Sequence, residues 1–193
     1  VVHDLVTADL FCSKDYLFGT KRLCVDSHYF QTLNRENVAL VDVKNAPIEE
    51  ITEKGLITGS KEYEFDCLVF ATGFDAMTGA LTNIDIRGRE GVSLKDKWSA
   101  GPRTYLGLQS VGFPNLFTIT GPGSPSVLSN MIVSIEQHVD WITECLGHIR
   151  TNNLATIEPN LDAQDNWVEH VNEMANRTLY PQANSWYLGA NVP

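Results

Sequence analysis

Residues 66–75 read Asp-Cys-Leu-Val-Phe-Ala-Thr-Gly-Phe-Asp, a short apolar run that ends at a Thr-Gly turn. An uninterrupted apolar run of this length, bounded by turn residues, is typical of a strand buried on both faces, as in a parallel sheet. Gly73 is a position where the backbone can take a positive φ or approach another group closely. The run predicts either a central strand that ends beside a ligand or a core strand that ends at an ordinary glycine turn.

The chain before this run predicts further strands. Residues 38–43 read Val-Ala-Leu-Val-Asp-Val and indicate a buried strand. Residues 48–52 and 56–58 indicate a hairpin, and residues 61–65 alternate so that every second side chain shares one face. We expect a β-meander that leads the chain back to a central strand.

The other segments are mainly helical or irregular in pattern. Residues 1–17 carry apolar side chains at helical spacing and predict the end of a helical segment. Residues 79–104 are rich in glycine and charged side chains, so a mostly irregular excursion is expected, and residues 115–120 indicate another buried strand. Apolar residues recur every three or four positions over residues 132–149 and 162–179, which predicts two amphipathic helices.

Composition and charge exclude several classes of function. The chain has 193 residues, 43% hydrophobic and 20% charged, as in a globular protein of one or two small domains. No apolar run approaches the ~18 residues of a membrane span, and a net charge of −10 argues against nucleic acid as a partner. The four cysteines and five histidines lack ligand-like spacing. We therefore expect no metal site and no disulfide framework, and the reduced thiols fit the cytoplasm.

The best candidate site that residue patterns alone provide is the loop and helix start after residue 120. Residues 121–126 read Gly-Pro-Gly-Ser-Pro-Ser, which is not a G-x-G-x-x-G dinucleotide motif, because Ser stands last and two prolines lack N–H groups. Residues 126–135 contain no Asp or Glu. The N–H groups of the helix start therefore favour an electron-rich partner, or else Ser126 or Ser129 caps the helix.

Five short motifs occur in a fixed order along the chain. They are Phe-Gly-Thr-Lys-Arg at 18–22, Gly-Pro-Arg-Thr-Tyr-Leu-Gly at 101–107, Phe-Pro-Asn-Leu-Phe at 113–117, the loop at 121–126, and Ser-Trp-Tyr-Leu-Gly-Ala-Asn-Val-Pro at 185–193. Together with the Ala-Thr-Gly turn, this set resembles the C-terminal part of a Baeyer–Villiger monooxygenase of the cyclohexanone or phenylacetone monooxygenase type. The resemblance covers essentially the whole chain.

The resemblance implies an α/β flavoprotein with two dinucleotide-binding domains, of which this chain is the C-terminal part. Residues 1–17 would end a helical insertion, residues 18–71 would complete an NADP-binding domain with its β-meander, and residues 72–193 would complete an FAD-binding domain. The enzyme would use FAD, NADPH and O2 to convert a small ketone to an ester or lactone through a C4a-peroxyflavin. A cytoplasmic monomer without nucleic-acid or membrane partners is expected.

The basic pair at residues 21 and 22 gains a role from the resemblance, although such a pair after a Gly-Thr turn is usually solvated surface. Lys21 would contact the 2′-phosphate of NADPH. Arg22 would lie over the flavin as the catalytic residue. Its permanent charge would disfavour protonation of the peroxide and stabilise the oxyanion of the adduct with the ketone.

The resemblance also implies positions that bind cofactor or substrate. Trp186 would close over the nicotinamide ribose, although an aromatic residue beside glycine is more often a packing residue. Thr72 and Gly73 would be hinge residues near the cofactors, and Met131 would also bind cofactor. The substrate pocket would be lined by Ser126, Val127, Leu128 and Ser129.

Parts of the family pattern are absent from these residues. They contain no G-x-G-x-x-G motif and no signature stretch with Phe, Gly, His and Trp-Pro, so we expect a polypeptide truncated at its front and, by a shorter length, at its end. Such a chain would be marginally folded and inactive by itself. Two alternatives stay open: a related flavin monooxygenase that oxidises nitrogen or sulfur, and a non-catalytic interaction domain on the same scaffold.

Overall fold

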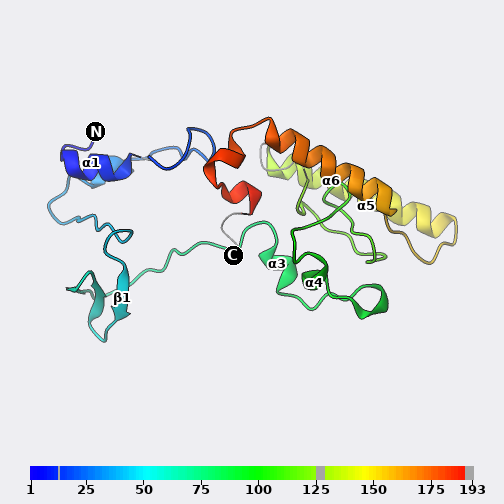
Figure 1. Cartoon of the computed structure of the whole chain (residues 1–193), viewed down its shortest axis with the longest axis horizontal. Helices are drawn as coiled ribbons and strands as arrows, with labels where there is room; N and C mark the ends of the chain where they lie inside the picture. Colours follow the sequence, from blue (N-terminus) through cyan, green and yellow to red (C-terminus); the bar gives the residue numbers. More distant parts are fainter. Residues whose placement is uncertain (13, 125–128, 190–193) are drawn as a thin grey trace. The chain divides into compact units, whose positions relative to one another are not determined.

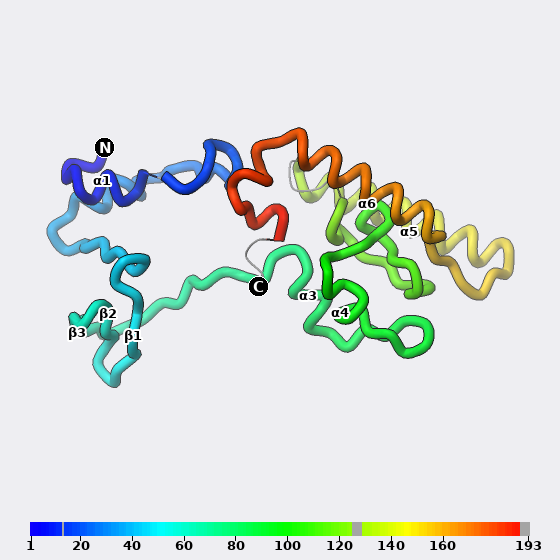
Figure 2. Tube along the Cα trace, in the orientation of Figure 1, coloured from blue at the N-terminus to red at the C-terminus, as the bar shows by residue number. Residues whose placement is uncertain are grey.

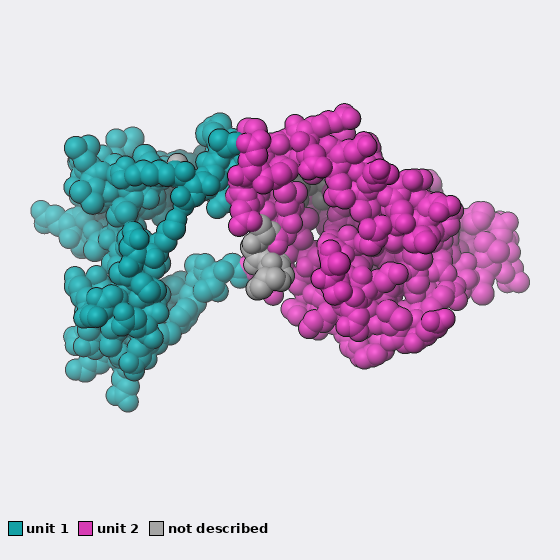
Figure 3. All heavy atoms as spheres, viewed as in Figure 1, with its two compact units in different colours: residues 1–73 teal, residues 74–193 magenta. Residues whose placement is uncertain are grey.

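The chain divides into two compact units in the computed structural model, which describes residues 1–12, 14–124 and 129–189. Unit 1 is Val1–Gly73 and unit 2 is Phe74–Pro193 (Figure 3). The assignment of these parts to an NADP-binding and an FAD-binding domain stays a prediction. None of the helices in the described ranges is both long enough and apolar enough to span a membrane.

Unit 1 begins with two short helices, α1 (Leu5–Phe11) and α2 (Tyr29–Thr32) (Figure 1). The rings of Phe11, Tyr29 and Phe30 meet edge to face, with centroids 5.6 to 6.0 Å apart. Aromatic rings prefer this geometry because the positive edge of one ring meets the negative face of the next. The cluster joins α1, which lies within the predicted helical segment, to α2.

A three-stranded antiparallel sheet follows, made of β1 (Ile48–Ile51), β2 (Gly55–Thr58) and β3 (Lys61–Glu64) in that order. These strands confirm the predicted hairpin and its extension into a meander. Tyr63 and Phe65 stack with their ring centroids 6.2 Å apart. The two rings therefore share one face, as the alternation predicts.

Two predicted buried strands do not form in unit 1. Residues 38–43 and 66–73 make no strand, and Val69 and Phe70 are 86% and 68% exposed. A buried strand needs a hydrogen-bonded neighbour on each side, and the described part of unit 1 pairs neither run with one. The trace between β3 and α3 accordingly runs without regular structure (Figure 2).

Unit 2 has a small apolar core held by short helical turns. Leu94, Trp98 and Phe113 are buried at its centre, and Leu81 and Ile86 pack against them. Most of residues 79–104 is irregular, as expected, but this stretch also supplies much of the core. Its regular elements are α3 (Gly79–Thr82), the 3-10 turn η1 (Arg89–Gly91) and α4 (Leu94–Lys97).

Two long helices confirm the helical periodicity in the second half of the chain. They are α5 (Met131–Thr151) and α6 (Leu161–Asn176), which run in opposite directions (Figure 1). Asn160 caps α6, since its Oδ1 accepts the Ala163 N–H at 2.7 Å. The tail then forms the 3-10 turns η2 (Tyr180–Ala183) and η3 (Trp186–Leu188).

The strand predicted at residues 115–120 is also wrong. Asn115 and Thr120 have φ angles of +61° and +52°, which lie in the left-handed region and are incompatible with an extended strand. Ile119 between them is 47% exposed. The segment is therefore a loop with a turn at each end.

Candidate functional site

Unit 2 contains a cavity of about 540 Å3 that is bordered by its glycine-rich loop, α6 and the tail. Aromatic rings and valine side chains form part of its wall, and both charged lining residues are cations. In a chain of net charge −10, such a lining favours a ligand with an apolar body and an electron-rich group. These lining residues are Trp98, Trp167, Val168, Val171, Tyr187, Lys97 and Arg103.

The loop at residues 120–124 contributes to this wall and is fixed by side chains from distant parts of unit 2. The Thr104 hydroxyl donates to the Pro122 carbonyl at 2.7 Å. The Trp167 indole N–H donates to the Gly123 carbonyl at 3.1 Å. Two successive carbonyls of the loop are thus held by two different segments.

His138 of α5 fixes the start of the same loop. Its Nδ1 accepts the Thr120 N–H at 3.1 Å, and the side chain is 3% exposed. Burial lowers the pKa of His138, which favours the neutral ring that this hydrogen bond requires. The buried histidine therefore stabilises the left-handed turn at Thr120.

Two glycines allow the loop to lie directly against an earlier segment. A Cβ on Gly121 would lie 2.4 Å from the Gly107 carbonyl oxygen, and a Cβ on Gly107 would lie 2.6 Å from the Ser124 nitrogen. The Thr118 hydroxyl donates to the same Gly107 carbonyl at 2.8 Å. Backbone therefore packs on backbone here, and a side chain at either glycine has no room.

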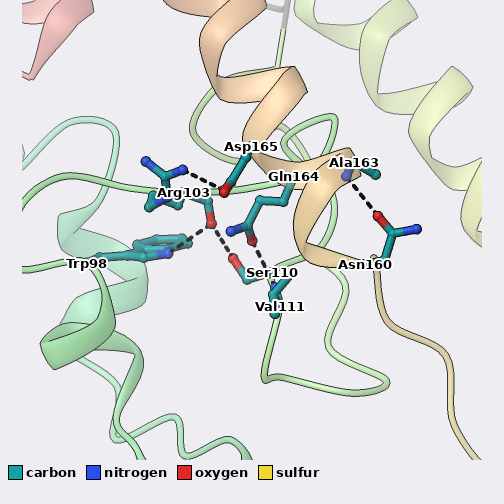
Figure 4. A network of polar contacts seen from close by, with 8 residues as sticks. All are labelled: Trp98, Arg103, Ser110, Val111, Asn160, Ala163, Gln164 and Asp165. Carbon is teal, nitrogen blue, oxygen red and sulfur yellow. Dashed lines mark hydrogen bonds and ion pairs between the residues drawn. The ribbon is translucent and has the colours of Figure 1, made fainter.

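Asp165 ties α6 to the segment that carries Arg103 (Figure 4). The Trp98 indole and the Ser110 hydroxyl both donate to the Arg103 carbonyl, at 3.3 and 2.7 Å. The Arg103 guanidinium pairs with Asp165 of α6 at 2.5 Å. These contacts hold Arg103, one of the two cations of the cavity, at its backbone carbonyl and at its guanidinium.

A second set of contacts joins α6 and the segment before it to the turn at residues 111–115. Gln164, which is 1% exposed, accepts the Val111 N–H at 2.9 Å (Figure 4). Glu158 accepts the Gly112 N–H at 2.9 Å and receives two N–H groups of Arg89, at 2.8 and 2.6 Å. The Arg89 guanidinium, followed by the Gly112 N–H, holds the pKa of Glu158 below its ordinary value of 4.5.

Glu158→Gln is expected to lower the free energy of unfolding by about 1–2 kcal/mol at neutral pH, because two charge-assisted hydrogen bonds are weakened. Folding lowers the pKa of Glu158, so its contribution is present above pH 4.5 and is lost as the pH falls through the folded-state pKa. Urea unfolding of the wild type and of Glu158→Gln at pH 7 and at pH 3 measures the difference in free energy of unfolding and its dependence on pH. Glu169→Gln, at an exposed position of α6, is the control, and a wild-type advantage unchanged at pH 3 would contradict the assignment.

The start of α5 carries Met131, which the sequence analysis assigns to cofactor binding. Asn130 caps this helix, since its Oδ1 accepts the Ile132 N–H at 3.0 Å, so the alternative of a Ser129 cap is wrong. Ser129 instead exchanges a hydrogen bond with Ser134 at 2.8 Å. The first turn of α5 contains no acidic residue, as expected. The Asn130 cap accepts only one of the N–H groups at the start of the helix. The other N–H groups and the positive end of the helix dipole suit an electron-rich partner.

The predicted catalytic residue Arg22 and the predicted NADPH-binding residue Lys21 lie in unit 1. Lys21 and Arg22 are exposed, and the Lys21 ammonium lies 4.2 Å from the centroid of the Tyr16 ring. Thr72 and Gly73 end the same unit, and Gly73 has the positive φ expected for it, +83°. The roles of these four residues stay predictions.

The other predicted site residues belong to unit 2. Trp186 stacks on Tyr187 with ring centroids 4.1 Å apart, and Tyr187 lines the cavity. Trp186 is therefore one residue away from the cavity wall, which is compatible with both the packing role and the cofactor role. Three predicted substrate residues lie outside the described ranges: Ser126, Val127 and Leu128.

Sequence reasoning did not identify the residues that hold the loop. Thr104 stood out only as part of a motif, Trp167 only as part of a predicted amphipathic helix, and His138 only as one of five histidines without ligand-like spacing. A signal was nevertheless present for both donors. Thr104 is a hydrogen-bond donor on a segment of low regularity, and Trp167 is a hydrogen-bond donor on an apolar helix face. However, the carbonyl that Thr104 reaches is 18 residues away in the chain, and the carbonyl that Trp167 reaches is 44 residues away.

Comparison with known proteins identifies relatives over nearly the whole chain, although no family model matches. The 2-oxo-Δ3-4,5,5-trimethylcyclopentenylacetyl-CoA monooxygenase of Pseudomonas putida is 42% identical over 97% of this chain. A Baeyer–Villiger monooxygenase of Pseudooceanicola batsensis is 41% identical over 100% of it. Phenazine N-monooxygenase PhzNO1 of Lysobacter antibioticus is 38% identical, also over 100%.

The chain spans about a third of the length of these relatives, 34–35%. Solved structures match over the same share. A closed crystal structure of cyclohexanone monooxygenase superposes with a TM-score of 0.93 at 42% identity, over 100% of this chain and 36% of that one. OTEMO in complex with FAD and NADP gives a TM-score of 0.92 at 43% identity, over 96% of this chain and 35% of that one.

These matches confirm the fold class expected from the motifs, that of a two-domain α/β flavoprotein of which this chain is one part. In sequence and in fold, the chain corresponds to about a third of a Baeyer–Villiger monooxygenase.

Proposed function

We propose that the protein to which this chain belongs is a flavin-dependent Baeyer–Villiger monooxygenase, which uses NADPH and O2 to convert a small ketone to an ester or lactone. The similarity of the whole chain to enzymes of this family, in sequence and in fold, carries the proposal. We also propose that the enzyme is a cytoplasmic monomer, as its composition and family suggest.

The residues present fit part of a site for FAD and NADPH. The start of α5 has no acidic residue of its own to occupy its positive end, and the cavity of unit 2 combines aromatic rings with cations. Among this chain's residues, Lys21, Thr72, Gly73, Met131 and Trp186 would hold the two cofactors. Bound FAD would supply the activation of O2, with NADPH as its source of reducing equivalents.

Arg22 is proposed to stabilise the negative charge that develops on oxygen when a ketone is attacked. The turn before it supports this placement, because Thr20 is 1% exposed and its hydroxyl donates to the Leu17 carbonyl at 2.5 Å. Lys21 and Arg22 follow this anchored turn and are both exposed. A guanidinium keeps its charge at every physiological pH and presents several donors in one plane.

Lys21→Ala is expected to raise the KM for NADPH about tenfold or more, because a charge-assisted contact with the 2′-phosphate is lost. The KM for NADH should change little, since NADH lacks that phosphate. Steady-state kinetics with NADPH and with NADH measure the two KM values and thus their ratio. Lys61→Ala is a matched control, since the Lys61 ammonium also lies over a tyrosine ring, 4.5 Å from its centroid; equal losses with both nucleotides would contradict the role of Lys21.

A second candidate reaction is the oxidation of a ring nitrogen, which the 38% identity to a phenazine N-monooxygenase favours. The enzyme that carries this chain would be incubated with NADPH, O2 and either a cyclic ketone or a phenazine, and the products identified by mass spectrometry. Formation of a lactone supports the first proposal, and formation of only an N-oxide supports the second. Flavin-bound protein that forms neither product would refute both.

We further propose that residues 1–193 by themselves bind flavin poorly and are inactive. Val69 is 86% and Phe74 is 95% exposed in a run whose pattern is that of a buried strand. Exposed apolar surface of this kind lowers the solubility and stability of an isolated chain. Near-ultraviolet circular dichroism of the purified chain tests this, and a rigid fold with bound yellow flavin would contradict it.

A further inference from the structure

Two consecutive carbonyl groups at the cavity wall are held by donors from two separate segments of unit 2. The Thr104 hydroxyl, in a residue 3% exposed, donates to Pro122, and the Trp167 indole donates to Gly123. All four residues line the cavity. We call these two hydrogen bonds, from Thr104 and from Trp167, the clamp. The clamp therefore lies at the cavity and not in a remote part of the fold.

The clamp leaves little freedom at the residue between the two donors. Gly123 has a φ of +79°, and a Cβ there would lie 3.2 Å from the Thr104 hydroxyl oxygen and 3.8 Å from the Trp167 indole nitrogen. The Ser124 N–H continues the turn by donating to the Gly121 carbonyl at 3.1 Å. The position of this backbone thus follows the positions of the two donors.

The clamp also decides the chemistry that the loop presents. Pro122 has no N–H group, and the carbonyls of Pro122 and Gly123 are both engaged. The wall is then made by the proline ring, the indole of Trp167 and the side chains of α6. Apart from Asn172, the side chains that α6 and the loop add to this wall are apolar, so the wall discriminates ligands mainly by size.

We propose that Thr104 and Trp167 are positioning residues that fix this wall and thereby set the size of the apolar ligand that the cavity admits. The inference rests on the proposed function in one respect, namely that the ligand is a ketone. Neither residue needs to touch the reacting atoms, since each acts through the loop backbone.

The first test measures the loop itself, in the full enzyme and without turnover. Trp167→Phe and Thr104→Val each remove one donor and keep most of the side-chain volume, and loss of one hydrogen bond should speed hydrogen exchange at the Ser124 amide by about five- to tenfold. Thr104→Ser keeps the hydroxyl and should restore slow exchange. Trp141→Phe is the matched control, because Trp141 packs edge-on against Phe117 and does not line the cavity.

The second test measures ligand selection with cyclopentanone, cyclohexanone and cyclooctanone, through Kd values from ligand-detected NMR and through KM where turnover occurs. Both donor-deleted variants should change the ratio of affinities between the smallest and largest ring by about threefold or more, with kcat for the best ketone changed less. Unchanged exchange at Ser124, or altered exchange with unchanged ratios, would overturn the inference. If the wild type binds these ketones but oxidises none, the proposed function fails while the binding ratios still decide the role of the clamp.

Discussion

Replacing Arg22 by alanine is expected to reduce ester or lactone formation by about 10²- to 10³-fold, the usual effect of removing a donor that stabilises developing negative charge. Unfolding and flavin binding should be nearly unchanged, because Arg22 is exposed at the surface of unit 1. Product formation from a cyclic ketone, measured beside flavin absorbance, distinguishes a loss of chemistry from a loss of cofactor.

The size of the loss in Arg22→Lys separates charge from geometry. Lysine keeps the positive charge but not the planar group of donors, so an intermediate activity is expected. Arg35→Ala is the control, because Arg35 is also an exposed arginine of unit 1 and should leave product formation unchanged. If Arg22→Ala forms lactone at the wild-type rate, the catalytic assignment is wrong.

Gly107→Ala is expected to lower the free energy of unfolding of unit 2 by about 3 kcal/mol, from backbone strain and overpacking together. Gly107 has a φ of +71°, and its Cβ would lie 2.5 Å from the Ser124 Cβ and 2.8 Å from the Gly121 carbonyl oxygen. Neither neighbour can withdraw easily, since the Ser124 N–H is bonded to the Gly121 carbonyl. Urea unfolding followed by tryptophan fluorescence measures the change.

Gly147→Ala gives the control with the opposite sign. Gly147 lies within α5, and a Cβ there would meet nothing within 4 Å. Alanine in an exposed helix interior should therefore raise stability by about 0.5–1 kcal/mol. Equal effects of the two substitutions would show that the close packing at Gly107 does not contribute to stability.

Local sequence patterns predicted correctly those elements whose backbone hydrogen bonds form within the segment or with a neighbouring segment. The helix α5 and the helix α6 follow from apolar spacing, because every residue in a helix interior bonds within the same segment. The strands β1 to β3 follow from a hairpin whose partners are adjacent in sequence. The same reasoning failed at residues 38–43, 66–73 and 115–120, where apolar runs predict strands whose partners are not among the described residues.

The candidate site was predictable only in part, and the reason is the same. The cofactor roles of Met131 and Trp186 stay predictions, and neither residue lines the cavity, whereas the contacts that hold the cavity wall have no signal in the sequence. The Trp167–Gly123 contact joins residues 44 positions apart, and the contact of His138 with Thr120 joins α5 to a loop. No periodicity in the chain encodes which backbone carbonyl a side-chain donor will reach.

The sequence by itself determined the family resemblance, the two long helices and the β-meander, and it predicts which residues would carry the chemistry. The tertiary structure alone decided that Thr104, Trp167 and His138 hold the loop at residues 120–124, and that the cavity of unit 2 lies beside it. Helices and hairpins are specified by neighbours in the chain, whereas a cavity wall is specified by packing and hydrogen bonds between segments that meet only after folding.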